Sequence, residues 1–167
     1  IHTNPNVVEK LVESDDHLTI DVYLKQGMKW QDGHPLNAQD FVFTMEMLKK
    51  ESVPCYTYKS EAAHIDSVKA IDDYHLQYKL TQPIATRLDL IGMPGCPVPK
   101  HLFEKEMVSN PDLKTGDYYQ KLAMNPVGNG PYKLIEWVEN EKLVFERWED
   151  YPGEKPYLKR IVFRIQP

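Results

Sequence analysis

Two aspartates in the first quarter of the chain, Asp32 and Asp40, could act as a pair of carboxylates in acid–base catalysis. Such chemistry needs two carboxyl groups that share a site and whose pKa values are driven apart. The local sequence gives each a structural role instead. Asp32 precedes Gly33 in a turn, and Asp40 follows Asn37 at the start of a helix, where a carboxylate favours the helix dipole. We therefore favour the structural interpretation for both aspartates.

The other residues that could do chemistry form no recognisable catalytic or metal-binding motif. Serines, threonines and cysteines occur in no known nucleophile motif. The loop Gly128-Asn129-Gly130 lacks the lysine and the following helix of a phosphate-binding loop, and its glycines fit a tight turn. The sequence therefore predicts no enzyme activity, no catalytic residue, no metal site and no cofactor. The histidines are scattered, without a pair four residues apart on a convincing helix, and are His2, His17, His34, His64, His75 and His101.

Composition narrows the classes of partner. The net charge is −5 and both signs are interspersed, so the chain has no basic stripe that would attract a nucleic-acid backbone. No run approaches the roughly 18 apolar residues that a transmembrane helix needs, and we expect no such segment in this chain. A chain of 167 residues can bury one sizeable core or two small ones.

The elements that must position these residues begin with a strand, a turn and a helix. Residues 18–24 alternate apolar and polar, which predicts a strand with one buried face. Pro35 keeps the approach extended, and Asn37 is expected to cap a helix over residues 38–48, whose apolar side chains repeat at helical spacing. Residues 52–63 are rich in turn-forming and polar residues and are expected to form a long loop.

The rest of the chain predicts two hairpins and several short helices. Residues 65–71 and 74–80 flank Asp72-Asp73 and should pair, and residues 132–138 should pair with a strand after residue 141. One more strand is expected over residues 158–165. Short helices are expected over residues 86–91, 99–107 and 117–124.

Several stretches, taken in order, resemble one protein family. They are LKQGMKWQDGHPLNAQDFVFT at residues 24–44, PKHLF at 99–103, NPVGNGPYKLIEW at 125–137 and ERWEDYPGEKPYLKRIVFRI at 146–165. Together they are similar to segments of the extracellular solute-binding proteins of family 5, the receptors for peptides and nickel in ABC importers. Members of that family are much longer, so the resemblance implies that this chain is part of a larger precursor.

The resemblance implies an α+β fold that forms part of a two-lobed, type II periplasmic-binding-protein fold. Residues 1–124 would form a small mixed subdomain of the first lobe, and residues 125–167 would contribute strands to the main-lobe sheet. The implied function is capture of a peptide-like solute for an ABC permease by lobe closure, without chemistry. The implied location is periplasmic or extracellular, with lipid anchoring left open. The alternatives are a receptor for nickel or another solute, and the ligand-sensing domain of a cytoplasmic transcriptional regulator.

Within this frame the aromatic residues and cysteines leave alternatives open. Tyr56 and Tyr58 lie in a stretch that resembles the region where some peptide-binding members present a tyrosine to the ligand, and packing within the subdomain is the other interpretation. Trp30 is expected to be buried rather than to stack on a ligand. Cys55 and Cys96 could form one disulfide or remain two thiols.

Overall fold

The computed structural model describes residues 7–51, 53, 56–85, 96–109 and 124–166. The chain forms two compact units, each of which is built from two segments. The first unit consists of residues 1–26 and 37–114, and the second unit of residues 27–36 and 115–167. The chain therefore leaves the first unit after Gln26, passes through the second unit, and returns at Asn37. The two units are described separately below.

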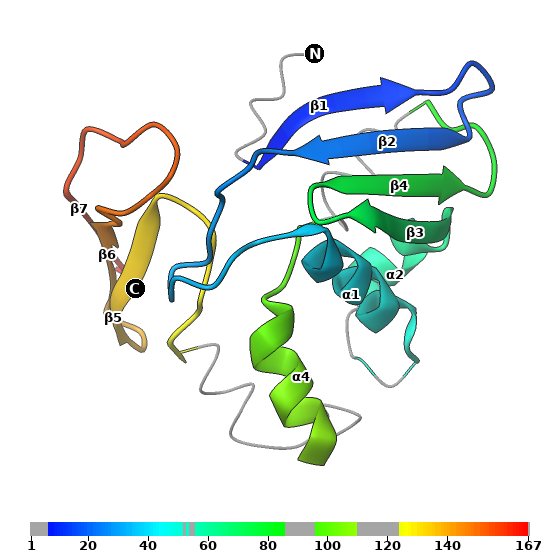
Figure 1. The fold of residues 1–167 in the computed structure, drawn as a ribbon. Coiled ribbons are helices and arrows are strands. Elements are labelled where there is room, and N and C mark those ends of the chain that lie inside the picture. The colour runs from blue at the N-terminus through cyan, green and yellow to red at the C-terminus, as the bar shows by residue number, and fades with distance from the viewer. Residues whose placement is uncertain (1–6, 52, 54–55, 86–95, 110–123, 167) are drawn as a thin grey trace. The chain divides into compact units, whose positions relative to one another are not determined.

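The structure contains helices and strands in both halves of the chain, which confirms the α+β class (Figure 1). In chain order the described elements are β1 (Val8–Glu13), β2 (Thr19–Leu24), α1 (Ala38–Lys49), α2 (Tyr56–Ala62), β3 (Ile65–Asp72), β4 (His75–Leu80), α4 (Lys100–Ser109), β5 (Tyr132–Val138), β6 (Lys142–Arg147) and β7 (Arg160–Arg164).

An antiparallel four-stranded sheet in the order β1-β2-β4-β3 forms the centre of the first unit (Figure 1). The predicted hairpin is confirmed, with Val68 opposite Tyr78 and Ala70 opposite Leu76. Strand β1 was not predicted, because its sequence VEKLVE is mostly exposed and lacks a clean alternation of apolar and polar residues. It forms the edge of the sheet, where exposed polar side chains are tolerated.

One face of this sheet carries the core of the first unit. The inward side chains of β2, which are Ile20, Val22 and Leu24, are at most 2% exposed. Helix α1 lies over this face in Figure 1, next to β3, and buries its own apolar side chains there. The opposite face carries polar and aromatic side chains from β2 and β4 and stays more open. The alternation in the sequence of β2 thus predicts correctly which side of the strand is buried.

Helix α1 begins where its capping residue was predicted. The side chain of Asn37 accepts the amide of Gln39 at 2.9 Å, and the backbone amide of Asn37 donates to the Asp40 carboxylate at 3.0 Å. This reciprocal pair satisfies amides that have no partner within the helix. The predicted helix over residues 38–48 is therefore confirmed as α1. The predicted helix over residues 99–107 is also confirmed, as α4, with Pro99 just before it.

The second unit contains an antiparallel three-stranded sheet in the order β5-β6-β7. The predicted hairpin of β5 and β6 is confirmed, and Asn140 in its turn adopts a left-handed conformation with φ of 60°. The rings of Phe145 and Phe163 meet edge to face across β6 and β7, with 5.8 Å between centroids. Val144, Trp148 and Tyr151 are buried in this unit.

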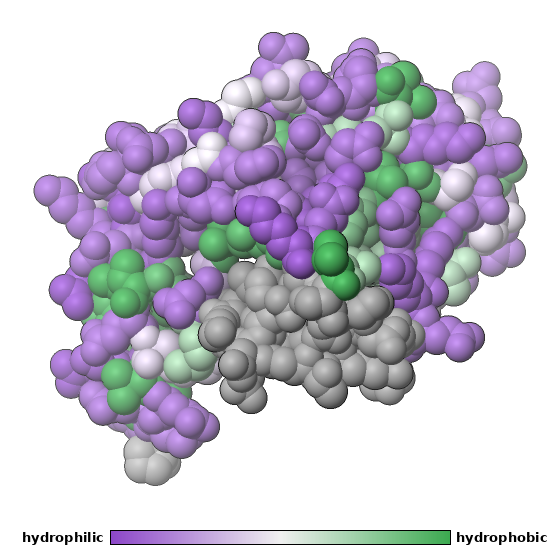
Figure 2. Space-filling model, turned by 60° about the horizontal axis from the view of Figure 1, so that its bottom comes forward, coloured by the Kyte–Doolittle hydropathy of each residue, from purple (hydrophilic) through white to green (hydrophobic). Residues whose placement is uncertain are grey.

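Other predictions differ from the structure or lie outside it. The helix expected over residues 86–91 lies outside the described residues, as does that expected over 117–124 except for Met124. Among the described helices, none is long and apolar enough to cross a membrane. On the face drawn in Figure 2, hydrophilic residues cover most of the described surface and hydrophobic residues form separate patches.

Candidate functional site

The two candidate ligand-binding tyrosines lie on helix α2, where the sequence predicted a loop. That prediction was wrong, because residues 56–62 form two turns of helix. The segment has no strong helical signal of its own, since it is short and contains Tyr, Thr and Ser, which have modest helix propensity. Helices of this length are stable only through tertiary packing.

Packing on α1 explains why α2 forms. The Lys59 ammonium donates to the carbonyl oxygens of Lys50 at 2.6 Å and of Glu51 at 3.1 Å, just after the end of α1. Ala62, one turn further along α2, is 2% exposed. A lysine at the carbonyl end of a helix satisfies acceptors that lack intrahelical partners. Lys59 thus fixes α2 to the end of α1.

Of the two tyrosines, the structure describes the side chain of Tyr58 only. Tyr58 is 37% exposed, so a large part of its ring and hydroxyl can meet solvent or a ligand. Tyr56 is the first residue of α2, and its side chain lies outside the described part.

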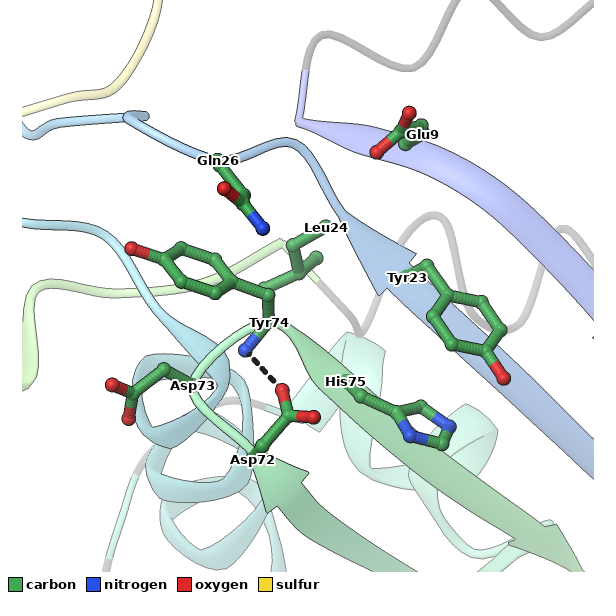
Figure 3. Close-up of a pocket in the computed structure, with 8 residues that line it drawn as sticks. All are labelled: Glu9, Tyr23, Leu24, Gln26, Asp72, Asp73, Tyr74 and His75. Atoms are coloured by element: carbon green, nitrogen blue, oxygen red, sulfur yellow. Dashed lines mark hydrogen bonds between the residues drawn. The ribbon is translucent and has the colours of Figure 1, made fainter.

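A hollow of about 410 Å³ lies on the first unit where β2 ends and β4 begins, and nothing in the sequence pointed to it. Its lining comes from β1, from the end of β2 and from the β3–β4 turn, as Figure 3 shows. The Asp72 carboxylate accepts the amide of Tyr74 at 2.7 Å, which fixes this turn. The lining residues are Glu9, Tyr23, Leu24, Gln26, Asp72, Asp73, Tyr74 and His75.

Beside this hollow, aromatic and polar side chains meet on the open face of the sheet. The rings of Tyr23 and His75 stack with 4.3 Å between centroids, and Lys10 lies 5.8 Å from the centre of the Tyr23 ring. His75 Nε2 lies 2.8 Å from Asp21 Oδ1, and the side-chain amide of Gln77 donates to the same oxygen at 3.2 Å. These contacts join β1, β2 and β4 and hold His75 in one orientation.

The charge of the hollow limits what it could bind. Three of its lining residues are carboxylates and none is Lys or Arg, so a bound carboxylate would be repelled. The free carboxylate of a peptide C-terminus would find no opposite charge in this lining. The hollow is therefore unsuited to anchoring that end of a peptide.

Side chains that could take part in acid–base or metal chemistry have structural roles here. Asp32 accepts the amide of His34 at 3.0 Å within the turn, and Asp40 is buried at the helix start. Burial raises the pKa of the Tyr78 hydroxyl above its ordinary value, so it stays protonated at neutral pH. Among the described residues, no group of three or more His, Cys, Asp or Glu side chains could hold a metal ion.

The residues singled out as packing or turn elements behave as such. Trp30 is 1% exposed, which confirms its burial. The loop of Gly128 and Gly130 is held by the side chain of Gln31. The element that follows this loop is strand β5, not a helix. Cys96 is exposed and Cys55 lies outside the described residues, so the cysteine pairing stays a prediction.

Comparison with known proteins supplies what the geometry alone does not. The family described as bacterial extracellular solute-binding proteins, family 5 Middle, matches residues 2–167. The chain is 33% identical to the periplasmic oligopeptide-binding protein OppA of Salmonella typhimurium, over 90% of this chain and 29% of that protein.

Solved structures show the same fold. The oligopeptide-binding protein AppA of Bacillus subtilis, in complex with a nonapeptide, matches with a TM-score of 0.79 and 26% identity over 96% of this chain and 31% of that one. NikZ from Campylobacter jejuni, in complex with Ni(L-His), matches with a TM-score of 0.78 and 27% identity over 96% of this chain and 30% of that one.

These matches agree in extent and in fold. The chain spans about a third of the length of the relatives it matches, and those with solved structures are two-lobed periplasmic binding proteins. The family match covers nearly all of the chain, including α2 and the two hairpins. The chain belongs to the bacterial extracellular solute-binding proteins of family 5.

Proposed function

We propose that this chain is part of a receptor that captures a peptide-like solute for an ABC importer and performs no chemistry. The observation that carries the proposal is family membership, together with relatives named as dipeptide- and oligopeptide-binding proteins. Capture would proceed by closure of two lobes around the solute, a hinge motion common in binding proteins. The receptor would work in the periplasm or outside the cell and deliver its solute to a permease.

Residues 1–124, which include α2, would form the small subdomain of the first lobe, and residues 125–167 would contribute strands to the main-lobe sheet. Tyr56 and Tyr58 are the proposed ligand-contacting residues. Support comes from the exposure of Tyr58 and from the chemistry of tyrosine, whose rigid ring and single hydroxyl suit a peptide backbone. The anchors for the charged ends of a peptide would then come from elsewhere in the receptor, since the hollow in Figure 3 repels carboxylates.

A binding screen with the full-length receptor tests this function. Isothermal titration calorimetry with di-, tri- and longer peptides should give saturable binding, with no new product after prolonged incubation by mass spectrometry. The same peptides with amidated C-termini serve as a control for recognition of the terminal carboxylate. Absence of binding across the whole peptide series, in a receptor shown to be folded, would contradict the proposal.

Nickel–chelate capture is a second candidate, favoured by the likeness to a solved protein that carries Ni(L-His). The described residues offer no group of three or more His, Cys, Asp or Glu side chains that could hold a metal ion, so a chelating small molecule would have to supply most of the ligands. Titration of the full-length receptor with nickel alone, histidine alone and their mixture separates the two functions. Binding of the mixture only, in a receptor that ignores peptides, would replace the peptide proposal with this one.

A further inference from the structure

The ten residues by which the second unit interrupts the first, residues 27–36, form a small hairpin of their own. Lys29 pairs with Pro35, and the amide of Leu36 donates to the carbonyl of Met28 at 3.0 Å. Gly33 adopts a positive φ of 90°, which a glycine tolerates at the turn. We call residues 27–36 the excursion. Lys29 and Pro35 lie opposite each other on its two arms, and Gln31 lies near the turn that joins the arms.

Leu24 and Ala38, which flank the excursion in the chain and which we call its root, are held by the β3–β4 turn of the first unit. The amide of Leu24 donates to the carbonyl of Tyr74 at 2.7 Å, and the amide of Ala38 donates to the carbonyl of Asp73 at 2.9 Å. Two successive carbonyls of one turn thus hold the outgoing and the returning strand. Leu24 and Ala38 are both buried, so these hydrogen bonds are shielded from water. Figure 3 shows this turn and the end of β2 side by side.

The tip of the excursion is fixed in the second unit through Gln31. Its backbone amide donates to the carbonyl of Gly128 at 2.9 Å, and its side-chain oxygen accepts the amide of Gly128 at 3.2 Å. Its side-chain nitrogen donates to the carbonyls of Gly130 at 3.0 Å and Tyr132 at 2.7 Å. The Lys133 ammonium donates to the Gln31 carbonyl at 2.8 Å. Both backbone polar groups and both side-chain polar atoms of Gln31 are therefore engaged with residues 128–133.

We propose that the excursion is a tether that couples the folding of the two units, with Gln31 as the residue that holds its tip. The excursion itself is hydrogen-bonded within the second unit, whereas Leu24 and Ala38, which flank it in the chain, are hydrogen-bonded within the first unit. The two sets of hydrogen bonds therefore act on one short, continuous stretch of chain. If the contacts of Gln31 are lost, the root stays ordered, but its order no longer depends on whether the second unit is folded. The coupling is a property of the connection and is independent of which solute the receptor binds.

The distribution of optical probes allows a direct test. All three tryptophans of the chain, Trp30, Trp137 and Trp148, belong to the second unit, whereas the described helices α1, α2 and α4 belong to the first. Tryptophan fluorescence therefore follows the second unit, and circular dichroism at 222 nm follows mainly the first. In urea titrations of the parent, the two signals should give coincident midpoints, the signature of one cooperative transition.

The variant Gln31→Leu leaves a branched apolar side chain that is one atom shorter and removes the three side-chain hydrogen bonds of Gln31. We expect its fluorescence midpoint to fall below its circular dichroism midpoint. Gln77→Leu is the matched control, because Gln77 makes one side-chain hydrogen bond within the first unit. Its two signals should remain coincident. Coincident midpoints in Gln31→Leu, or separate midpoints already in the parent, would overturn the proposal.

Native-state hydrogen exchange of the parent keeps the test decisive if Gln31→Leu does not fold. The amides of Leu24 and Ala38 report the root, and those of Gln31 and Gly128 report the tip. Coupling predicts that the four amides open with equal protection factors, within about tenfold, because they belong to one cooperative unit. Tip amides that exchange more than about tenfold faster than root amides would show that the tip opens locally and that no tether exists.

Discussion

One oxygen of the Asp40 carboxylate accepts the backbone amide of Lys100 at 3.0 Å, which joins the first turn of α1 to the first residue of α4. The other oxygen accepts the amide of Asn37 at 3.0 Å. Asp40 is only 4% exposed, so a single buried carboxylate serves two helix starts. Its negative charge lies near the positive end of both helix dipoles, an arrangement that stabilises each helix.

Replacing Asp40 by Asn tests this double role. An amide offers one oxygen, so one of the two backbone amides would face an NH₂ group and lose its acceptor. A buried donor left without a partner costs about 1–3 kcal/mol. We therefore expect Asp40→Asn to lower the free energy of unfolding by that amount in urea titrations followed by circular dichroism.

Asp32→Asn is the control for the Asp40 variant. Asp32 is exposed, and its one oxygen that accepts the His34 amide is retained in asparagine, which also suits the residue before a turn glycine. Its effect should stay within about 0.5 kcal/mol. If the two variants lost equal stability, the shared cap at Asp40 would contribute nothing beyond an ordinary surface carboxylate.

The cap itself is tested at Asn37. Asn37→Ala removes the acceptor for the Gln39 amide and should cost on the order of 1 kcal/mol. Asn37→Ser restores an acceptor and should recover most of the loss, because serine is a good capping residue. Thermal unfolding of the three proteins checks this. Equal melting midpoints for the parent and the alanine variant would refute the assignment of Asn37 as the cap.

Residues 18–48 show how far local sequence can predict this fold. The alternation in β2 and the cap at Asn37 each act over a few residues, so both could be read directly from the sequence. The contact of Asp40 with Lys100 could not, because the two residues are 60 positions apart. The sequence around a buried carboxylate at a helix start does not indicate which distant residue donates the second hydrogen bond to it.

Strand β1 and helix α2 were missed for a common reason. Each is stabilised by contacts with another element rather than by its own sequence. Residues 8–13 become a strand by pairing with β2, and residues 56–62 become a helix against the end of α1, where Lys59 donates to two carbonyls. Tertiary contacts override weak local propensity in such segments.

The sequence suggested candidate residues for ligand binding but not the hollow, and the reason lies in the same distinction. Resemblance to a family drew attention to Tyr56 and Tyr58, and the structure shows Tyr58 exposed. The hollow next to His75 depends on the register of β2 against β4, which places Tyr23 opposite His75. No motif in the sequence encodes that register, so the hollow could be found only from the coordinates.

The ion pair of Glu149 with Arg147 predicts a dependence of stability on pH. Arg147 donates two hydrogen bonds to Glu149 Oε1, at 2.8 and 3.0 Å, and this holds the pKa of the Glu149 carboxyl below its ordinary value of 4.5. A lowered pKa means that the folded state favours the charged form. The stabilisation is therefore present above pH 4.5 and is lost as the pH falls through the lowered pKa.

The variant Glu149→Gln should remove this dependence. We expect the parent to be slightly more stable than the variant above pH 5, and the difference to vanish at lower pH. Thermal unfolding followed by tryptophan fluorescence from pH 3 to 7 checks it. Glu139→Gln, in the turn between β5 and β6, is the control, since it removes a carboxylate from the same unit and leaves the Arg147–Glu149 pair in place. A pH-independent difference for Glu149→Gln would contradict the prediction.

Residues 1–167 alone should bind solute weakly. A surface that covers one side of a ligand cannot exclude water from it or supply opposing charges, and so gains little of the affinity of a closed cleft. We expect a dissociation constant no tighter than about millimolar for peptides that the full-length receptor binds well. Calorimetry on the isolated chain provides the measurement. Micromolar binding would show that this part of the receptor holds a complete site.

The tyrosines of α2 provide the prediction that connects residues to function. If α2 lines the cleft, Tyr58→Ala or Tyr56→Ala in the full-length receptor should weaken solute binding by about 1–2 kcal/mol, through loss of a ring contact and a hydrogen bond. Stability should change little for Tyr58, which is exposed. Phenylalanine at each position keeps the ring and loses only the hydroxyl, and so separates the two contributions.

A third tyrosine supplies the control for this experiment. Tyr74 is 36% exposed, nearly as much as Tyr58, and lies at the hollow beside β4 rather than on α2. Tyr74→Ala should leave solute affinity unchanged in calorimetric titrations. If Tyr58→Ala and Tyr56→Ala bind like the parent, the tyrosines of α2 serve the packing of the first unit. If Tyr74→Ala is the variant that weakens binding, the solute contacts the sheet side of that unit instead of α2.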